Sequence, residues 1–312
     1  MMAARAGTTS ARAVSGPPHP DLALDVHSLL IQVLNGVQYG LLLFLVASGL
    51  TLVFGVMGII NLAHGSFYMV GAYMAFTLSS LTGSLLLAVV LGTVLSALLG
   101  IVLERAFFSR LYERDHLEQV LLTYGLILVF EELRSLVAGN DVHGVPVPPV
   151  LAGSIKLTDV LSYPVYRLFM SAVCLALAGG LYVLIHRSRL GMTIRAGASN
   201  REMVQSLGVD VRRLYRWVFG LGVALAAFAG MIAAPVSSVY PGMGTQVLII
   251  CFVVVVIGGI GSVWGALGAA LLVGLVDTFG RVLLPNAAGV SVYVLMAVIL
   301  LWRPEGLFRR PA

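Results

Sequence analysis

The residues in this sequence whose types and spacing suit chemistry are few. No Gly-x-x-x-x-Gly-Lys-[Ser/Thr] motif occurs, nor even a Gly-Lys pair, so the chain cannot use ATP alone. Neither His-Glu-x-x-His nor Gly-x-Ser-x-Gly is present, which removes two common hydrolase arrangements. Cys174 and Cys251 lie inside apolar runs, where they build neither a disulfide framework nor a metal site. We therefore expect no catalytic residue, no metal, no cofactor and no enzyme.

An arginine-rich loop, residues 186–216, carries the most specific local pattern. It holds seven arginines, and within it Ser199-Asn200-Arg201-Glu202 forms a capping-box pattern. We expect Ser199 to cap a short helix, Glu202 to reach back to it, and Gly208 to take the left-handed conformation that ends it. The loop would thus present a compact surface helix. A solvated helix that merely follows the charge bias of cytoplasmic loops is the alternative at this point.

Two apolar stretches, residues 54–76 and 252–274, are each interrupted by glycines, one in each half of the chain. Paired interruptions of this kind in a membrane protein point to a translocation path. The first also holds two polar side chains, which cost free energy at such depth unless they are paired. These either satisfy backbone groups at a broken helix end or line the path, whereas helix packing is the competing explanation for most of the glycines. The candidate path residues are Asn61, His64, Gly65, Gly258, Gly259, Gly261 and Gly265.

These residues have to be positioned by elements that cross a membrane. Of the 312 residues, 59% are hydrophobic and 11% are charged, whereas soluble domains carry about 25% charged residues. That composition excludes a soluble globular protein and a disordered chain, and the alternating pattern of an outer-membrane barrel is absent. Several apolar segments have the ~20 residues that cross a bilayer. The segments are 29–56, 66–81, 84–103, 119–137, 164–185, 217–236, 246–257, 263–280 and 290–302.

The predicted fold class is all-α, a polytopic helical membrane protein with about eight to ten spans and two glycine-broken segments. Arginines cluster in residues 104–118, in the loop 186–216 and after Trp302, whereas the loop 138–163 has Lys156 as its one basic residue. Because cytoplasmic loops are enriched in Lys and Arg, we expect the three clusters inside and the loop 138–163 outside. Nine crossings that start outside satisfy this pattern. The net charge of +5 thus marks orientation in the membrane, and we predict no nucleic-acid partner.

Four stretches carry a resemblance to a known family. Residues 202–208 resemble the Glu-Ala-Ala-x-x-x-Gly pattern of the coupling helix in ABC importer permeases, with Met203 and Val204 in place of the two alanines. The other three stretches resemble branched-chain amino-acid ABC permeases: residues 49–65 (GLTLVFGVMGIINLAHG), 258–269 (GGIGSVWGALGA) and 302–308 (WRPEGLF). The resemblance spans about residues 30 to 310. It is closer to the shorter of the two permeases that such systems use.

The resemblance implies a permease subunit in the inner membrane of a bacterium. A periplasmic binding protein would deliver branched-chain amino acids, a second homologous permease would complete the path, and two ATP-binding subunits would drive alternating access. It implies one transmembrane permease domain over residues 29–312, with the coupling loop at 186–216. Residues 1–28 fall outside the resemblance, and because they are rich in Ala, Ser, Gly and Pro we expect them to form a mobile tail. The expected coupling residues are Ser199, Asn200, Glu202, Val204, Leu207 and Gly208.

Other interpretations stay open at this point. Related permeases resemble this chain and carry urea or short amides, so the substrate is not fixed. An ion-coupled secondary transporter needs carboxylates within the membrane, and the sequence offers Glu131, Glu132 and Asp277 near it. No selectivity filter of an ion channel is visible, and a structural scaffold would not need a capped helix in its largest basic loop. Asp277 and Arg281 share a helix face, either as an interfacial ion pair or as a lining for a zwitterionic substrate.

Overall fold

The computed structural model describes residues 26–112, 114–156 and 162–307. The predicted tail lies outside the described residues as far as residue 25, and residues 26–28 already belong to the first helix. Strands β1 (Ser154–Lys156) and β2 (Ser162–Pro164) pair antiparallel. The α-helices of the described residues are α1 (Val26–Met57), α2 (His64–Thr82), α3 (Leu85–Ala106), α4 (His116–Ala138), α5 (Val165–Arg187), α6 (Arg189–Ser199), α7 (Arg201–Ser206), α8 (Val211–Ser237), α9 (Met243–Gly258), α10 (Val263–Leu283) and α11 (Ala288–Trp302).

The predicted apolar segments correspond one by one to α1–α5 and α8–α11, so the all-α, polytopic class is confirmed. Within the described part of the chain, α1, α3, α5, α8 and α10 are each long and apolar enough to cross a membrane. Helices α9 and α11 are apolar but have 16 and 15 residues, about 24 Å or less, which is shorter than a ~30 Å hydrocarbon core. Both predicted interruptions are present, at residues 58–63 and 259–262.

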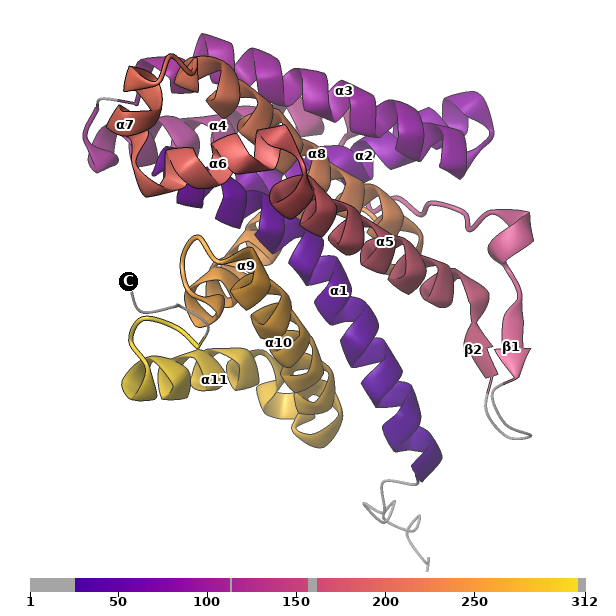
Figure 1. The fold of residues 1–312 in the computed structure, drawn as a ribbon. Coiled ribbons are helices and arrows are strands. Elements are labelled where there is room, and N and C mark those ends of the chain that lie inside the picture. Colours follow the sequence, from indigo (N-terminus) through magenta and orange to yellow (C-terminus); the bar gives the residue numbers. More distant parts are fainter. Residues whose placement is uncertain (1–25, 113, 157–161, 308–312) are drawn as a thin grey trace, which may run out of the picture.

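Helix α1 is the axis of the molecule. In Figure 1 it runs between two groups of helices, α2–α8 on one side and α9–α11 on the other. It packs on α10 and α8 along much of its length and also contacts α5 and α9. Its most apolar stretch is almost entirely buried, whereas the equivalent stretches of α3 and α5 are largely exposed. Helix α1 is therefore a core helix, and α3 and α5 offer apolar surface to lipid.

The connecting segments gather at two ends of the helix bundle. One end, here called the basic end, includes residues 107–112, 114–115 and 188–210, and the opposite end includes residues 139–156, 162–164 and 238–242. The arginine-rich connecting segments thus lie at one end and the arginine-poor ones at the other, as the charge pattern predicts. Which end faces the cytoplasm stays a prediction. At the basic end, Arg216 pairs with Glu104 over 3.3 Å. At the opposite end, Tyr163 donates a hydrogen bond to Asn35 over 3.1 Å, and His143 forms a backbone bridge with Val239.

The first interruption turns the chain back into the interior. Gly58, directly after α1, has φ +69°, a conformation that glycine adopts without a steric penalty. At the start of α2, Nε2 of His64 lies 3.0 Å from the carbonyl oxygen of Val46. Val46 precedes Met57, the end of α1, by eleven positions, which is about 16 Å along a helix axis. Helix α2 therefore begins deep in the protein, as a re-entrant segment does.

The second interruption closes against the first. Gly259 and Gly261 have φ of +88° and +83°, and Ser262 caps α10 by accepting a hydrogen bond from Gly265 N over 3.0 Å. A Cβ atom on Gly55, near the end of α1, would lie 2.9 Å from the Cα of Gly261. The two broken segments, far apart in the sequence, are therefore in backbone contact.

A close crossing joins α2 to α8. A Cβ added to Gly71 would collide with the backbone of Ala227, and one added to Gly230 would collide with the carbonyl oxygen of Tyr68. Small residues let helix backbones approach and gain van der Waals contact, which drives helix association where lipid replaces water. Helix α8 also packs along α1 and α3, so it ties the central helices together.

Gly71→Ala is expected to lower the apparent melting temperature of the purified protein by several degrees. The new methyl group overlaps backbone atoms of α8, and overpacking of this kind costs about 1–3 kcal/mol. Gly125→Ala in α4 is the matched control, because a Cβ there meets nothing within 4 Å and alanine favours a helix. Thermal unfolding in detergent measures both variants. Equal stability of the two would contradict the close crossing of α2 and α8.

Candidate functional site

Helix α7 is capped by Asn200. Its Oδ1 accepts a hydrogen bond from Met203 N over 2.9 Å, and its backbone is extended at φ −151°, ψ 100°. The prediction that Ser199 is the cap is wrong by one residue, because α6 continues through Ser199 and the chain leaves the helical conformation only at Asn200. The predicted ending is confirmed, since Gly208 has φ +82°.

Helix α6 precedes α7 and was not predicted from the sequence. Ser188 caps it by accepting a hydrogen bond from Gly191 N over 2.9 Å. Gly191, Ile194 and Gly197 are buried at a spacing of three residues and form its inner face. The helix packs on α1, α5 and α8. That spacing, with a serine in front of it, was the pattern from which the helix could have been predicted.

A cluster of charged and aromatic side chains holds α7 to α3 and α8, and we call it the Arg201 cluster. The Arg201 guanidinium lies 6.0 Å from the ring centroid of Tyr112 and 5.5 Å from that of Tyr215, within cation–π range. Tyr112 donates a hydrogen bond to Glu104, which is fully buried and also pairs with Arg216 over 3.3 Å. Burial and that hydrogen bond raise the pKa of Tyr112 above its usual value, so the phenol stays protonated as a donor.

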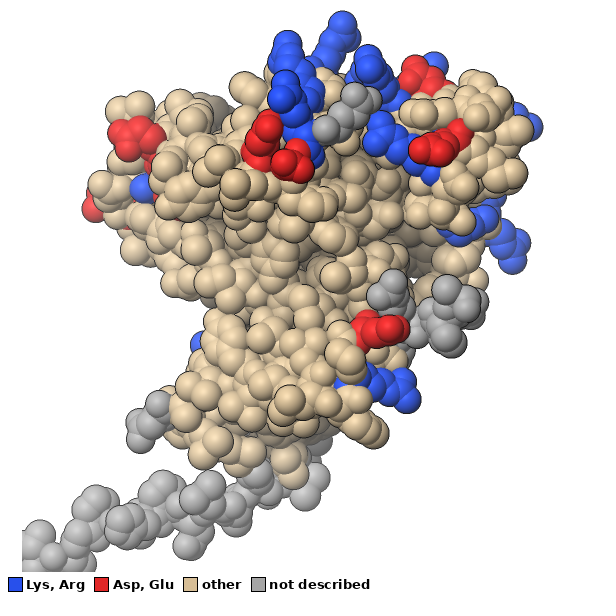
Figure 2. Space-filling model, turned by 90° about the vertical axis from the view of Figure 1, so that its left-hand side faces the viewer, with Lys and Arg blue, Asp and Glu red and all other residues tan. Residues whose placement is uncertain are grey.

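The outer face of α7 is partly apolar. Val204 turns inward and is buried, whereas Met203 and Leu207 are 62% and 75% exposed. Glu202 is exposed on the same helix. Figure 2 shows charged side chains gathered toward the top of the molecule, while its middle is almost free of them. Large apolar side chains exposed among charges on a short capped helix are typical of a protein–protein contact.

Asn61 and His64 are fully buried in and beside the first interruption. Oδ1 of Asn61 accepts a hydrogen bond from Ala63 N over 3.1 Å, and His64 faces the Val46 carbonyl. Asn61 thus satisfies a backbone group at the broken helix end, and His64 attaches the start of α2 to α1. Nδ2 of Asn61 and Nδ1 of His64 have no hydrogen-bond partner within the described residues. That these side chains line the path stays a prediction.

The predicted path glycines lie at helix contacts. Gly65 closes on Gly244 at the start of α9, and Gly258 and Gly265 close on each other across the second interruption. The two left-handed glycines described above form the turn between them. The structure thus brings the predicted path residues into two regions of backbone contact. The two cavities described next are lined by other residues, so the path role of these glycines also stays a prediction.

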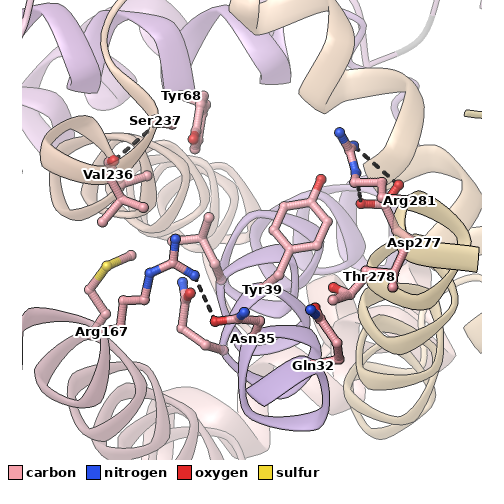
Figure 3. Close-up of a pocket in the computed structure, with 15 residues that line it drawn as sticks. Gln32, Asn35, Tyr39, Tyr68, Arg167, Val236, Ser237, Asp277, Thr278 and Arg281 are labelled. Atoms are coloured by element: carbon pink, nitrogen blue, oxygen red, sulfur yellow. Dashed lines mark hydrogen bonds and ion pairs between the residues drawn. The ribbon is translucent and has the colours of Figure 1, made fainter. Parts of the chain in front are cut away.

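A cavity of about 370 Å³ lies between α1, α5 and α10 near the opposite end, and residues of α2 and α8 also line it (Figure 3). We call it the polar cavity. Its volume falls in the range of about 300–1,000 Å³ that is usual for small-molecule sites. The polar lining is Gln32, Asn35, Gln38, Tyr39, Tyr68, Arg167, Ser237, Asp277, Thr278 and Arg281, and the apolar lining is Leu42, Met170, Ala233, Val236 and Val282.

Two charged groups stand on different sides of the polar cavity. On α5, Nη1 of Arg167 donates a hydrogen bond to Oδ1 of Asn35 over 2.7 Å. On α10, Arg281 donates two hydrogen bonds to Asp277, over 2.8 and 3.2 Å. Figure 3 shows Tyr39 of α1 standing between these groups. The cavity therefore offers a cation and a buried, paired carboxylate from separate helices.

The sequence singled out Asp277 and Arg281 but not the α1 side of this cavity. Asn35, Gln38 and Tyr39 recur at helical spacing inside the apolar α1. Polar positions that share one face of a membrane helix were thus the pattern to look for. The position of Arg167 opposite them depends on the packing of α5 against α1, which no local pattern encodes.

A second, apolar cavity of about 250 Å³ lies between the same three helices, nearer the basic end. Tyr182 stacks on His186 near the end of α5 with ring centroids 4.5 Å apart, and Trp264 at the start of α10 meets Tyr182 at 5.0 Å. Helices α1, α5 and α10 therefore border two cavities along their length. The one toward the opposite end is polar, and the one toward the basic end is apolar.

Asn200→Ala is expected to destabilise α7 by about 1 kcal/mol, the usual contribution of such a cap, because Met203 N loses its acceptor. Ser199→Ala is the matched control, since Ser199 is exposed and belongs to the end of α6. Hydrogen exchange of the first α7 amides should become faster in the Asn200 variant only. Faster exchange in the Ser199 variant instead would restore the cap predicted from the sequence.

Comparison with known proteins covers nearly the whole chain. Residues 32–302 match the family described as "Branched-chain amino acid transport system / permease component". The high-affinity branched-chain amino acid transport system permease protein BraD of Pseudomonas aeruginosa is 30% identical over 92% of this chain and 98% of its own length. The corresponding LivH protein of Escherichia coli K12 is 30% identical over 90% of this chain and 95% of its own. The permease protein LivM of the same organism is 27% identical over 83% of this chain and 66% of its own length. The chain therefore belongs to the family of permease components of branched-chain amino acid transport systems.

Proposed function

We propose that this chain is one permease subunit of an ATP-driven importer that carries branched-chain amino acids across the bacterial inner membrane. Family membership over residues 32–302 is the observation that carries the proposal. Because the sequence has no phosphate-binding loop, the energy has to come from separate ATP-binding subunits. Two such subunits, a second homologous permease and a periplasmic binding protein complete the importer that we propose.

Helix α7 is proposed to dock on one of the ATP-binding subunits. Leu207 and Met203 would supply the apolar contacts of that interface, and Glu202 a charge beside them. Asn200 fixes the start of the helix and Gly208 fixes its exit, while the buried Val204 fixes its inner face. Asn200 is the single residue between α7 and α6, which ends at Ser199. When docked, α7 would therefore move as a rigid unit together with the ATP-binding subunit.

The Arg201 cluster would pass this movement to the membrane helices. Its residues belong to α7, to the end of α3 and to the first turns of α8, with Tyr112 in the connection after α3. Helix α8 packs along α1, α2 and α3, and α1 borders both cavities. A shift of α7 thus has a continuous packed route to the cavity walls, which is the physical requirement for coupling two distant sites.

Vesicles that contain this chain, its second permease and the ATP-binding subunits are expected to accumulate labelled L-leucine when binding protein and ATP are supplied. Omitting the ATP-binding subunits should abolish uptake, because this chain has no ATP site. Ionophores that dissipate ion gradients should leave uptake unchanged. ATP-independent, ionophore-sensitive uptake would instead indicate a secondary transporter, and uptake of labelled urea without leucine would replace the proposed substrate.

Gly208→Val is expected to lower the leucine taken up per ATP hydrolysed severalfold. A β-branched residue is strained at φ +82°, by about 1–3 kcal/mol, and would displace the end of α7. Gly83→Val is the matched control: Gly83 has φ +68°, ends α2, and like Gly208 leaves open space around an added Cβ. Both variants carry similar strain, but only one adjoins α7.

Glu202→Arg tests the same coupling without backbone strain, since it reverses a charge on the outer face of α7. Uptake should again fall relative to ATP hydrolysis. If Gly208→Val and Glu202→Arg both transport leucine at the wild-type ratio, α7 is not the coupling helix. A loss in Gly83→Val as large as in Gly208→Val would mean that strain alone explains the effect.

A further inference from the structure

We propose that the polar cavity binds one free amino acid inside the permease. Arg167 would hold its carboxylate, Asp277 would attract its ammonium group, and the apolar wall would receive an aliphatic side chain. The inference rests on the proposed function and extends it by assigning a substrate site to this chain itself. Three features of the cavity support it, each for a different part of the ligand, and a neutral amide adds to the two charged ones.

The cationic side of the cavity is built to take a carboxylate. A guanidinium carries five N–H donors in a planar fork whose geometry matches a carboxylate. The contact of Arg167 with Asn35, over 2.7 Å, fixes the side chain at the wall through Nη1. Donors of the fork remain for a ligand. Because Asn35 is neutral, the positive charge of Arg167 is not cancelled by its partner.

Asp277 supplies the complementary charge from α10. Its side chain is 6% exposed although it lines the cavity, whereas its partner Arg281 is 62% exposed. A carboxylate has about four lone-pair sites, and Arg281 donates to two oxygens, so Asp277 retains the capacity to accept from an ammonium group. A zwitterion also adds no net charge to this partly buried site, where a single unpaired charge would cost much more.

Gln38 adds a neutral polar side chain to the cavity wall. The residue is 6% exposed, and no hydrogen bond joins its amide to any residue within the described ranges. The amide therefore keeps donors and an acceptor for the carboxylate or ammonium group of a ligand.

The rest of the wall suits an aliphatic side chain. Leu42 and Met170 are buried and Val236 is 39% exposed, and all three line the cavity. Apolar wall next to a cation and a carboxylate is the combination that recognises a neutral α-amino acid with a hydrocarbon side chain. Urea and short amides have neither the two charges nor the hydrocarbon part, so this cavity favours an amino acid over them.

The test is ligand binding by the purified importer complex in the absence of binding protein. We expect L-leucine to raise its apparent melting temperature, because a ligand that binds the folded state stabilises it. 4-Methylpentanoate lacks the ammonium group and leucinamide lacks the carboxylate. Each should bind about tenfold or more weakly than L-leucine, the factor that loss of a charged hydrogen bond typically produces.

Single-charge variants locate the site. Arg167→Gln and Asp277→Asn should each weaken the response to L-leucine by about tenfold or more. Lys156→Gln and Glu132→Gln are the matched controls, because they remove one charge of each sign near the same end of the molecule, outside the cavity lining. These controls should respond to L-leucine as the wild type does. Equal responses from all four variants would overturn the proposal.

A charge swap separates ligand binding from structural pairing. Asp277→Arg combined with Arg281→Asp keeps an ion pair at the same i,i+4 positions. If the pair only stabilises α10, the double variant regains the wild-type response to L-leucine, which would overturn the role of Asp277. We expect no recovery. Arg167→Lys keeps the charge but not the fork, and should recover part of the affinity that Arg167→Gln loses.

The uptake assay separates this inference from the proposed function. Leucine uptake by a wild-type complex that leucine does not stabilise would overturn the cavity site and leave the importer intact. Stabilisation by leucine that depends on Arg167, in a complex that does not transport leucine, would support the site and contradict the proposed function.

Discussion

The backbone polar groups of residues 58–63 impose the constraint on which the rest of the structure depends. The segment begins at the exposed Gly58 and returns to the interior, where Asn61, Ala63 and His64 are fully buried. Water does not reach this interior in a bilayer, so the protein itself has to satisfy the buried groups. Asn61 does so locally at Ala63, and His64 attaches the returning chain to Val46. These side chains are buried because the returning part of the chain is buried. A polar pair at this depth is therefore explained by the path of the backbone before any ligand is considered.

Burying this turn requires helices that approach with almost no side chain between them. Gly55 meets Gly261, Gly65 meets Gly244, and α2 crosses α8 at glycines. Each contact leaves little room to slide, because packed interfaces of this kind have discrete arrangements and do not deform continuously. Helices α1, α2, α8, α9 and α10 thus form one frame. Helix α5 contacts this frame mainly through α1, with a buried hydrogen bond from Tyr166 to α8 and an aromatic contact between Tyr182 and Trp264 of α10. The cavities therefore lie where a tightly packed frame meets a less enclosed helix.

Sequence patterns predicted what depends on neighbouring residues and failed where tertiary packing decides. Apolar runs located the long helices, and glycines within such runs located both interruptions. The cap of α7 was misplaced because Ser199 and Asn200 are both good caps and only the end of α6 decides between them. Helix α6 was missed because two of its three inward positions are glycines. The polar cavity could not be predicted, since Asn35 and Arg167 are 132 positions apart.

The connection of α5 explains how an event at the basic end would reach the polar cavity. A single residue, Ser188, separates α5 from α6, and another, Asn200, separates α6 from α7. Helix α5 has 23 residues, about 35 Å of stiff rod, with Arg167 near its far end. Asp277 stands on α10, which belongs to the frame and has no such connection to α7. If α7 moves with an ATP-binding subunit, α5 would carry Arg167 relative to Asp277. The displacement that couples ATP hydrolysis would then separate the two charges that hold a zwitterion, which is what release of the substrate requires.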